Sequence, residues 1–280
     1  MQEFKVENHA PSYLPDGYDW EYIWGDEFDG NELDTTKWDF RTHMMQLEHP
    51  GWVKEEGISF DGNSNIIFSV IEKDGKICST QLQTGYNFMD SPVESKQDTA
   101  GDFGKNTRFV WPIGKLHKHK FTHRYGYYEC RCKLQKKPGW WSAFWMQSPI
   151  QGSTLNPEIS GIENDIMESF KPGIVSPHMN HMNGCGPDYK GISTGKGAEL
   201  SLDEYHYFGM LWTEDGYTFY IDGKEDGHSS EAVSKTEQFI YLTTEINGYR
   251  SNEFTATDEA RAAVGDQFIV DHVRVFDIKK

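Results

Sequence analysis

Short apolar and aromatic runs, separated by turn signals, are the feature that most limits how this chain can fold. Residues 58–60, 65–70 and 76–79 form three such runs, and Gly, Asn and Asp lie between them. Runs of this length and spacing are typical of strands in a sandwich or barrel. No stretch longer than about ten residues keeps the i, i+3, i+4 spacing of an amphipathic helix. We therefore expect an all-β fold, with one short helix possible at residues 256–264.

The run Gly139–Met146 is apolar on both faces and is predicted to be a central strand. Three of its residues are tryptophan, and aromatic faces also stack on sugar rings. Trp140 and Trp141 are candidates for a substrate cleft, with Trp141 the stronger of the two. We expect Phe144 or Trp145 in the core, and Trp145 is also kept as a substrate-binding candidate.

Composition limits the class of protein. The 280 residues are 36% hydrophobic and 14% aromatic, which is enough for one substantial core, and no linker or repeat interrupts them. We therefore expect one domain over residues 1–280, with residues 1–19 as an extended lead-in. The net charge of −17 argues against a nucleic-acid partner, which needs a basic face. The sequence contains no run of about 18 apolar residues, so it gives no indication of a membrane-spanning helix.

The N-terminal residues and the charge of the chain bear on its location. The first residues lack the basic and apolar regions of a signal peptide. The acid excess suits a protein that acts on a neutral or mildly charged polymer. We expect a monomer that is secreted, periplasmic or at the cell surface, in a form without its signal peptide.

Three carboxylates, Glu163, Asp165 and Glu168, fall within six residues. On a regular strand, Glu163 and Asp165 share a face and Glu168 has the opposite parity. One extra residue in a β-bulge would return Glu168 to the face of the other two. Such a cluster suits retaining glycoside hydrolysis, in which one carboxylate attacks the sugar and one carboxylic acid protonates the leaving group. A calcium-binding or merely solvated acidic strand is the alternative reading of this stretch.

With its flanking residues, this stretch resembles the bulged Glu-x-Asp-x-x-Glu signature of glycoside hydrolase family 16. Further landmarks occur in the family's order over residues 20–277: Trp24-x-Asp26-Glu27-Phe28-Asp29-Gly30, Lys37-Trp38, Trp141-Ser142-Ala143-Phe144-Trp145, Tyr205-His206, Trp212, Tyr220-x-Asp222-Gly223 and Asp271-x-Val273-Arg274-Val275-Phe276. The resemblance implies a concanavalin-like β-jelly roll of two curved antiparallel sheets with a concave substrate cleft. It also implies Glu163 as nucleophile, Asp165 as assisting acid and Glu168 as acid/base.

The resemblance leaves the substrate of the expected enzyme open. Enzymes with the bulged signature act on β-1,3-glucans or on red-algal galactans such as agar, porphyran and carrageenan. The laminarinase-like Trp-Pro-Ala is replaced here by Trp-Ser-Ala, and a polar strand end carries Glu245 and Arg250. These departures favour an endo-acting enzyme for β-galactans or host glycans. An endo-β-1,3-glucanase, a transglycosylase and a non-catalytic lectin are the alternatives.

Further expectations concern binding residues, a metal, the partner and the pH dependence. His181 and Asn183 share one strand parity near the acids and would suit recognition of sugar hydroxyls, with a metal site as the weaker alternative. Members of this family often carry a structural Ca²⁺, for which Glu27 and Asp271 are the matching residues. Catalysis itself needs no cofactor, and a polysaccharide or oligosaccharide is the expected partner. Repulsion between the carboxylates predicts a bell-shaped pH profile centred somewhat below neutral.

Overall fold

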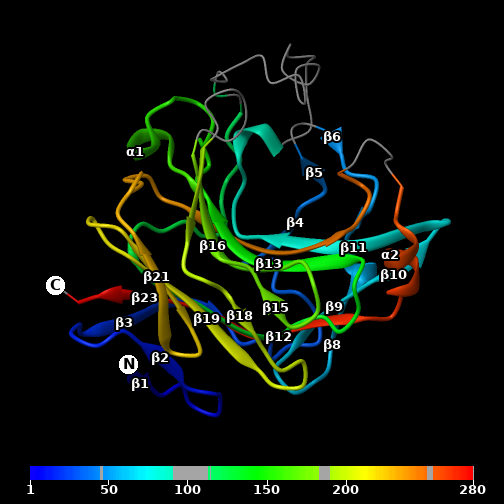
Figure 1. Ribbon diagram of the computed structural model, residues 1–280, viewed down its shortest axis with the longest axis horizontal. Coiled ribbons are helices and arrows are strands. Elements are labelled where there is room, and N and C mark those ends of the chain that lie inside the picture. The colour runs from blue at the N-terminus through cyan, green and yellow to red at the C-terminus, as the bar shows by residue number, and fades with distance from the viewer. Residues whose placement is uncertain (45–46, 91–112, 114, 183–189, 251–254, 280) are drawn as a thin grey trace.

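Two large β-sheets stack face to face in the computed structural model, which describes residues 1–44, 47–90, 113, 115–182, 190–250 and 255–279 (Figure 1). The first has nine strands in the order β10-β11-β22-β13-β14-β16-β17, and β4 and β7 also pair with β11. Its strands are β4 (Asp39–Phe40), β7 (Trp52–Val53), β10 (Ile71–Lys73), β11 (Lys76–Gln83), β13 (Trp140–Gln147), β14 (Glu163–Ser169), β16 (His178–Met182), β17 (Lys190–Thr194) and β22 (Phe239–Ile246). All pairs are antiparallel except that of β7 with β11.

The second sheet has eight strands in the order β21-β20-β19-β12-β23-β9-β8, and β3 pairs with β23. Its strands are β3 (Trp20–Asp26), β8 (Ile58–Phe60), β9 (Ile66–Ser69), β12 (Gly126–Lys133), β19 (His206–Trp212), β20 (Tyr217–Ile221), β21 (Lys224–Ser229) and β23 (Gln267–Ile278). The all-β jelly roll expected from the sequence is confirmed.

Short elements join and flank the two sheets. The predicted helix at 256–264 is present as α2 (Asp258–Ala262), and none of the described helices has the length and apolarity of a membrane span. The remaining elements are α1 (Pro157–Ser160), the 3₁₀ turns η1 (Glu55–Gly57) and η2 (Phe88–Asp90), and the strand pairs β1 (Gln2–Phe4) with β2 (Ser12–Leu14), β5 (His43–Met44) with β6 (Leu47–Glu48), and β15 (Ile174–Val175) with β18 (Ala198–Glu199).

The core lies between the sheets and follows strand alternation. Tyr128 and Cys130 of β12 and Phe144 and Met146 of β13 are fully buried members of one apolar cluster. Burial of such side chains stabilises the fold by about 1.5–3 kcal/mol each. Because neighbouring residues of a strand point to opposite faces, the odd-numbered residues of β13 are left to form the outer surface of the nine-stranded sheet.

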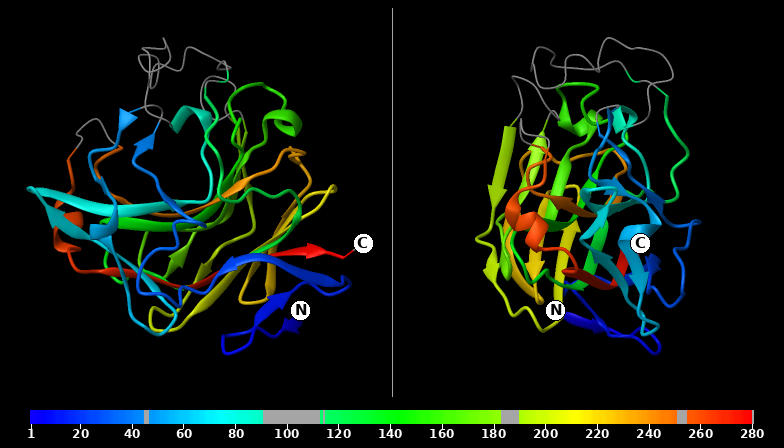
Figure 2. Two further views of the ribbon diagram at one scale, coloured as in Figure 1. Left: turned by 180° about the vertical axis from the view of Figure 1, so that it is seen from behind. Right: turned by 90° about the vertical axis from the view of Figure 1, so that its right-hand side faces the viewer.

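The lead-in is a folded part of the structure and not only an extended segment. Its strands β1 and β2 form a hairpin, and Leu14 joins a second apolar cluster with Tyr127 and Phe276 of the eight-stranded sheet. The fully buried Arg274 donates to the backbone oxygen of Ala10. The hairpin therefore covers the outer face of the eight-stranded sheet, and both termini lie on that side of the molecule (Figure 2).

The opposite face of the molecule is the one that carries the acids. The bent strands of the nine-stranded sheet form its floor, and β5, β6 and η2 lie above that floor on the side away from the other sheet (Figures 1 and 2). Chain segments remote in sequence thus form the walls around β13 and β14.

Candidate active site

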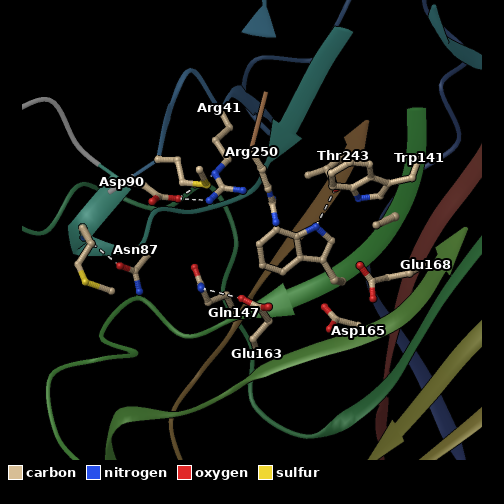
Figure 3. Close-up of a pocket in the computed structure, with 14 residues that line it drawn as sticks. Arg41, Asn87, Asp90, Trp141, Gln147, Glu163, Asp165, Glu168, Thr243 and Arg250 are labelled. Atoms are coloured by element: carbon tan, nitrogen blue, oxygen red, sulfur yellow. Dashed lines mark hydrogen bonds and ion pairs between the residues drawn. The ribbon is translucent and has the colours of Figure 1, made fainter. Parts of the chain in front are cut away.

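Strand β14 brings three acids to one face through a bulge. Its register with β13 pairs Phe144 with Met167 and Trp145 with Asp165, so Ile166 has no partner. This extra residue shifts the parity as the sequence predicted, and Glu163, Asp165 and Glu168 all line the same pocket (Figure 3). The cavity has a volume of ≈ 180 Å³. Its full lining is Arg41, Met44, Asn87, Met89, Asp90, Trp141, Ala143, Trp145, Gln147, Glu163, Asp165, Glu168, Thr243 and Arg250.

The two outer acids hold their protons with different strength. Burial and the neighbouring charge of Asp165 raise the pKa of Glu163 to about 7. Burial and the charges of Asp165 and Glu163 raise the pKa of Glu168 to about 9. Because like charges close together cannot all ionise, the group loses its protons in steps. Near neutral pH, Glu168 is the carboxyl that keeps its proton.

Glu163 is held from the side by a glutamine that the sequence analysis missed. The amide nitrogen of Gln147 donates to Oε2 of Glu163 at 3.1 Å (Figure 3). The hydroxyl of Tyr241 lies 3.4 Å from Oε1 of Gln147. Gln147 has the same strand parity as Trp141 and Trp145, so alternation along β13 was the available signal. Tyr241, which belongs to β22, gave no such signal.

The central acid, Asp165, is paired with His181 of β16. The Nε2 atom of His181 lies 2.9 Å from Oδ2 of Asp165. Burial lowers the pKa of His181, but the hydrogen bond to Asp165 and the charges of all three acids outweigh it and raise this pKa to about 9. A protonated imidazole therefore offsets part of the negative charge of the site. The sequence-based expectation that His181 lies with the acids agrees with this placement.

Aromatic and basic side chains form the upper wall. The ring of Trp145 stacks on Tyr241 with centroids 3.9 Å apart, and its indole N–H donates to Thr243 at 2.9 Å. Arg41 pairs with Asp90 at 2.6 Å and lies 5.4 Å from the Trp145 ring. Arg41 and Asp90 are 49 residues apart, and no pattern in the sequence pointed to either.

Of the tryptophan predictions, the one for Trp140 needs correction. Trp140 is fully buried, and its indole N–H donates to Asp266 at 3.0 Å, so it is a core residue and not a cleft residue. Trp145 lines the pocket, while Phe144 takes the core position. Trp141 lines the pocket as expected. Because neighbouring side chains of a strand point to opposite faces, only every second residue of β13 can face the cleft.

The other binding candidates have different positions. Arg250 lines the pocket, and its guanidinium lies 5.4 Å from the Trp141 ring. Glu245 is only 1% exposed and accepts from Nε of Arg250 at 2.7 Å, so it supports Arg250 from behind and does not face a substrate directly. Asn183 lies outside the described residues.

The carboxylates proposed for calcium are engaged elsewhere. Glu27 accepts two hydrogen bonds from Arg274, at 2.8 and 2.7 Å, and Asp271 accepts one from Arg131 at 2.9 Å. Arginine bound in this way neutralises the charge that a calcium ion requires. The side chains of Glu27 and Asp271 therefore do not fit a common calcium site, and calcium binding stays a prediction.

The acid site itself contains a group of residues with the spacing of a metal site. Within the described ranges, only Glu163, Asp165 and His181 form a group of three possible ligands, whose atoms lie within 4.8 Å of one another. The Asp165–His181 pair already explains this spacing, so the cluster is equally well described as part of the acid site.

Comparisons with known proteins agree with this fold and site. The profile of glycosyl hydrolases family 16 matches residues 111–263, which is more than half of the chain. A glucan endo-1,3-beta-glucosidase A1 of Niallia circulans is 29% identical over 214 residues, which are 72% of this chain and 28% of that protein. A kappa-carrageenase of Pseudoalteromonas carrageenovora is 27% identical over 276 residues, 90% of this chain and 62% of that protein.

The chain thus spans 28% and 62% of the length of these two curated relatives, less than two thirds of either. Among solved structures, the catalytic domain of an endo-1,3-beta-glucanase (laminarinase) from Thermotoga petrophila superposes with a TM-score of 0.65. The match covers 94% of this chain and 100% of that one at 20% identity, which supports the shared fold. With the profile match over more than half of its length, the chain belongs to glycosyl hydrolases family 16.

Proposed function

We propose that the protein is a retaining, endo-acting glycoside hydrolase that cleaves internal β-linkages of a polysaccharide. The observation that carries this proposal is the bulge in β14, which places Glu163, Asp165 and Glu168 in one pocket. The higher pKa of Glu168 supports its role as the acid and that of Glu163 as the nucleophile, because the nucleophile must be ionised and the acid protonated.

In the first step, an oxygen of Glu163 forms a bond to the anomeric carbon while the bond from that carbon to the glycosidic oxygen breaks. Glu168 transfers its proton to the departing oxygen. The hydrogen bond from Gln147 holds the attacking carboxylate in place. The His181 imidazolium keeps Asp165 from adding its full negative charge beside the nucleophile.

In the second step, Glu168 has lost its proton and acts as a base. It takes a proton from a water molecule, whose oxygen bonds to the anomeric carbon as the bond to Glu163 breaks. The two displacements restore both carboxyl groups and retain the anomeric configuration. A sugar hydroxyl in place of water would give transglycosylation by the same route.

For the substrate, the comparisons favour a β-1,3-glucan over the galactan expected from the sequence. Several similar proteins and structures carry names of β-1,3-glucanases or laminarinases. The charges in the pocket agree, because each lining arginine is already paired with a carboxylate: Arg41 with Asp90 and Arg250 with Glu245. A sulfated sugar would gain little from cations whose charge is already balanced.

A β-galactan is the second candidate. The alignments with kappa-carrageenase and with beta-porphyranase E of Zobellia galactanivorans cover 90% and 85% of this chain, against 72% for the glucan endo-1,3-beta-glucosidase A1. Either polymer is found outside cells, which favours a secreted, periplasmic or cell-surface enzyme.

A substrate panel tests this proposal directly. The protein is incubated with β-1,3-glucan, agar, porphyran, carrageenan and mucin glycans, and the products are resolved by chromatography. We expect oligosaccharides from one class, with the first product retaining its anomeric configuration by NMR. Glu163→Gln should abolish cleavage, and azide should rescue Glu163→Ala as the α-azide. Binding without cleavage by the unmodified protein would instead identify a lectin, and an inverted first product would exclude the mechanism.

A further inference from the structure

The bulge that turns Glu168 toward the cleft lies outside the ladders of its own sheet. Its extra residue, Ile166, is skipped by the register of β14 with β13. On the other side, the register of β14 with β16 ends at the pair of Asp165 and Met179. Among the described strands, Ile166 therefore has no partner residue in either neighbour. Its backbone groups are buried and need other partners.

A histidine side chain supplies such a partner. Nδ1 of His178 donates to the backbone oxygen of Ile166 at 2.8 Å. Because a carbonyl oxygen can only accept, the ring carries a proton on Nδ1. His178 is the first residue of β16, and it would stand opposite Ile166 if the ladder continued by one more pair. The imidazole thus binds the bulge at the point where strand pairing stops.

The ring of His178 is fixed on its other sides by the eight-stranded sheet. It is 1% exposed and stacks on Phe219 of β20, with centroids 4.4 Å apart and planes 8° apart. Its Nε2 atom lies 3.2 Å from Oδ2 of Asp226 in β21. The same oxygen accepts from the backbone N–H groups of Lys196 and Gly197, both at 3.0 Å. The ring therefore gives the bulge a rigid point of attachment.

This attachment affects the two catalytic carboxyl groups unequally. Glu163 precedes the bulge and has partner residues in both β13 and β16. Glu168 follows the bulge and is paired only with β13 among these two strands, while its backbone oxygen accepts from Ser176 at 2.9 Å. A shift of the Ile166 backbone would therefore move the carboxyl of Glu168 and leave that of Glu163 in place.

We propose that His178 is a positioning residue, whose hydrogen bond to Ile166 fixes the bulge and so places the Glu168 carboxyl beside the bond to be cleaved. His178 is not a catalytic residue, because it does not line the pocket. The proposal rests on the proposed glycosidase function. It adds that protonation of the leaving group by Glu168, and not attack by Glu163, depends on a side chain in the core between the sheets.

Three variants separate this hydrogen bond from the packing around it. His178→Phe keeps a ring that can stack on Phe219 but removes the donor. His178→Asn removes the ring but keeps a donor, because its amide nitrogen lies two bonds from Cβ, as Nδ1 of histidine does. Phe219→Leu is the control, since it removes the stacked ring and leaves the hydrogen bond. We expect His178→Asn and Phe219→Leu to have lower melting temperatures than the wild-type protein.

The measurement is kcat/KM on the phenyl and dinitrophenyl β-glycosides of laminaritriose, or of the corresponding galactan oligosaccharide if the panel identifies a galactan. Both values report the first step. Phenolate needs a proton from Glu168 to depart, whereas dinitrophenolate is a stable anion that does not. A smaller folded fraction would lower both values equally. The ratio of the two values therefore reports the acid alone.

His178→Phe should lower kcat/KM on the phenyl glycoside about 10- to 100-fold, the loss expected for a misplaced catalytic group, and less than about 3-fold on the dinitrophenyl glycoside. His178→Asn and Phe219→Leu should keep the wild-type ratio. An equal loss on both substrates in His178→Phe would show a merely structural residue and overturn the proposal. A changed ratio in Phe219→Leu would also overturn it, because packing and not the hydrogen bond would then place Glu168.

NMR of the wild-type protein with nitrogen-labelled histidine tests the same contact without a variant, in case His178→Phe does not fold. We expect a proton on Nδ1 of His178 that exchanges slowly with solvent, because the ring is buried and hydrogen-bonded. A ring without a proton on Nδ1 would overturn the proposal. A wild-type protein that cleaves neither aryl glycoside nor any polymer of the panel would refute the hydrolase proposal instead.

Discussion

Replacing Glu168 by glutamine should nearly abolish turnover and also stabilise the fold. Burial and two neighbouring acids raise the pKa of Glu168 from 4.5 to about 9. Between these values the folded protein holds a proton that the unfolded chain has released. Stability therefore falls as pH rises through this range, because the unfolded state binds fewer protons than the folded state. Glutamine resembles the protonated acid in shape and does not titrate, so its contribution to stability does not fall as pH rises.

The size of the effect follows from the two pKa values. Between pH 4.5 and pH 7, the raised pKa of Glu168 lowers the free energy of unfolding of the wild-type protein by at most about 3 kcal/mol. Glu168 is partly accessible to solvent, which screens its neighbours' charges, so we expect Glu168→Gln to gain about 1–2 kcal/mol at pH 7. Near pH 4 the carboxyl is protonated in both states, and the gain should disappear.

Urea denaturation of both proteins at pH 4, 7 and 8 measures this difference, and hydrolysis of the preferred polymer measures activity. Loss of the general acid should reduce kcat by a factor of about 10²–10⁴. Glu72→Gln, an exposed substitution on β10, is the control and should change stability little at any pH. If Glu168→Gln gained the same stability at every pH, or were less stable than the wild-type protein at pH 8, burial and like charge would not be what keeps Glu168 protonated.

Three further predictions concern the neighbours of this group. Gln147→Met should lower kcat about ten-fold with little change in KM or melting temperature, because it removes one hydrogen bond from the nucleophile; an unchanged kcat would contradict this role. Trp141→Ala should weaken oligosaccharide binding and leave the protein folded, because Trp141 lines the pocket. Trp140→Ala should lower the free energy of unfolding by about 3–5 kcal/mol in denaturation experiments, because Trp140 is buried. If Trp141→Ala destabilised the fold and Trp140→Ala only weakened binding, the assignment of the two residues to cleft and core would be wrong. The profile of kcat/KM against pH should rise through about 7 as Glu163 ionises and fall through about 9 as Glu168 loses its proton. This window lies above the slightly acidic optimum expected from carboxylate repulsion alone, because burial adds to both shifts, and an optimum below pH 6 would contradict it.

Local sequence determined the parts of this protein that depend on strand periodicity. The absence of helical spacing and the short apolar runs were enough for an all-β fold. The spacing of Glu163, Asp165 and Glu168 could place three acids on one face only through a bulge, and the register of β14 with β13 contains it. These features could be predicted because side-chain direction along a strand alternates with a fixed period of two.

Periodicity alone did not determine which face of a strand is buried. In β13, alternation places Trp140 and Trp141 on opposite faces, but the sequence would allow either face to be the buried one. The structure buries Trp140 and Phe144 because that face meets the eight-stranded sheet, and the parity of Trp141, Trp145 and Gln147 is left for the cleft. If the burial of one residue of β13 had been known, alternation would have assigned every other residue of the strand to the core or to the cleft.

Only the tertiary structure could place the residues that come from elsewhere in the chain. Arg41 pairs with Asp90 and lies over the ring of Tyr241, and Gln83 of β11 pairs with Tyr241 of β22, because strands far apart in sequence are neighbours in the sheet. Register between such strands depends on how all the inward-facing side chains pack together. That packing is a property of the whole chain, so no local pattern around Arg41 or Asp90 could have shown that they line the pocket of the acids.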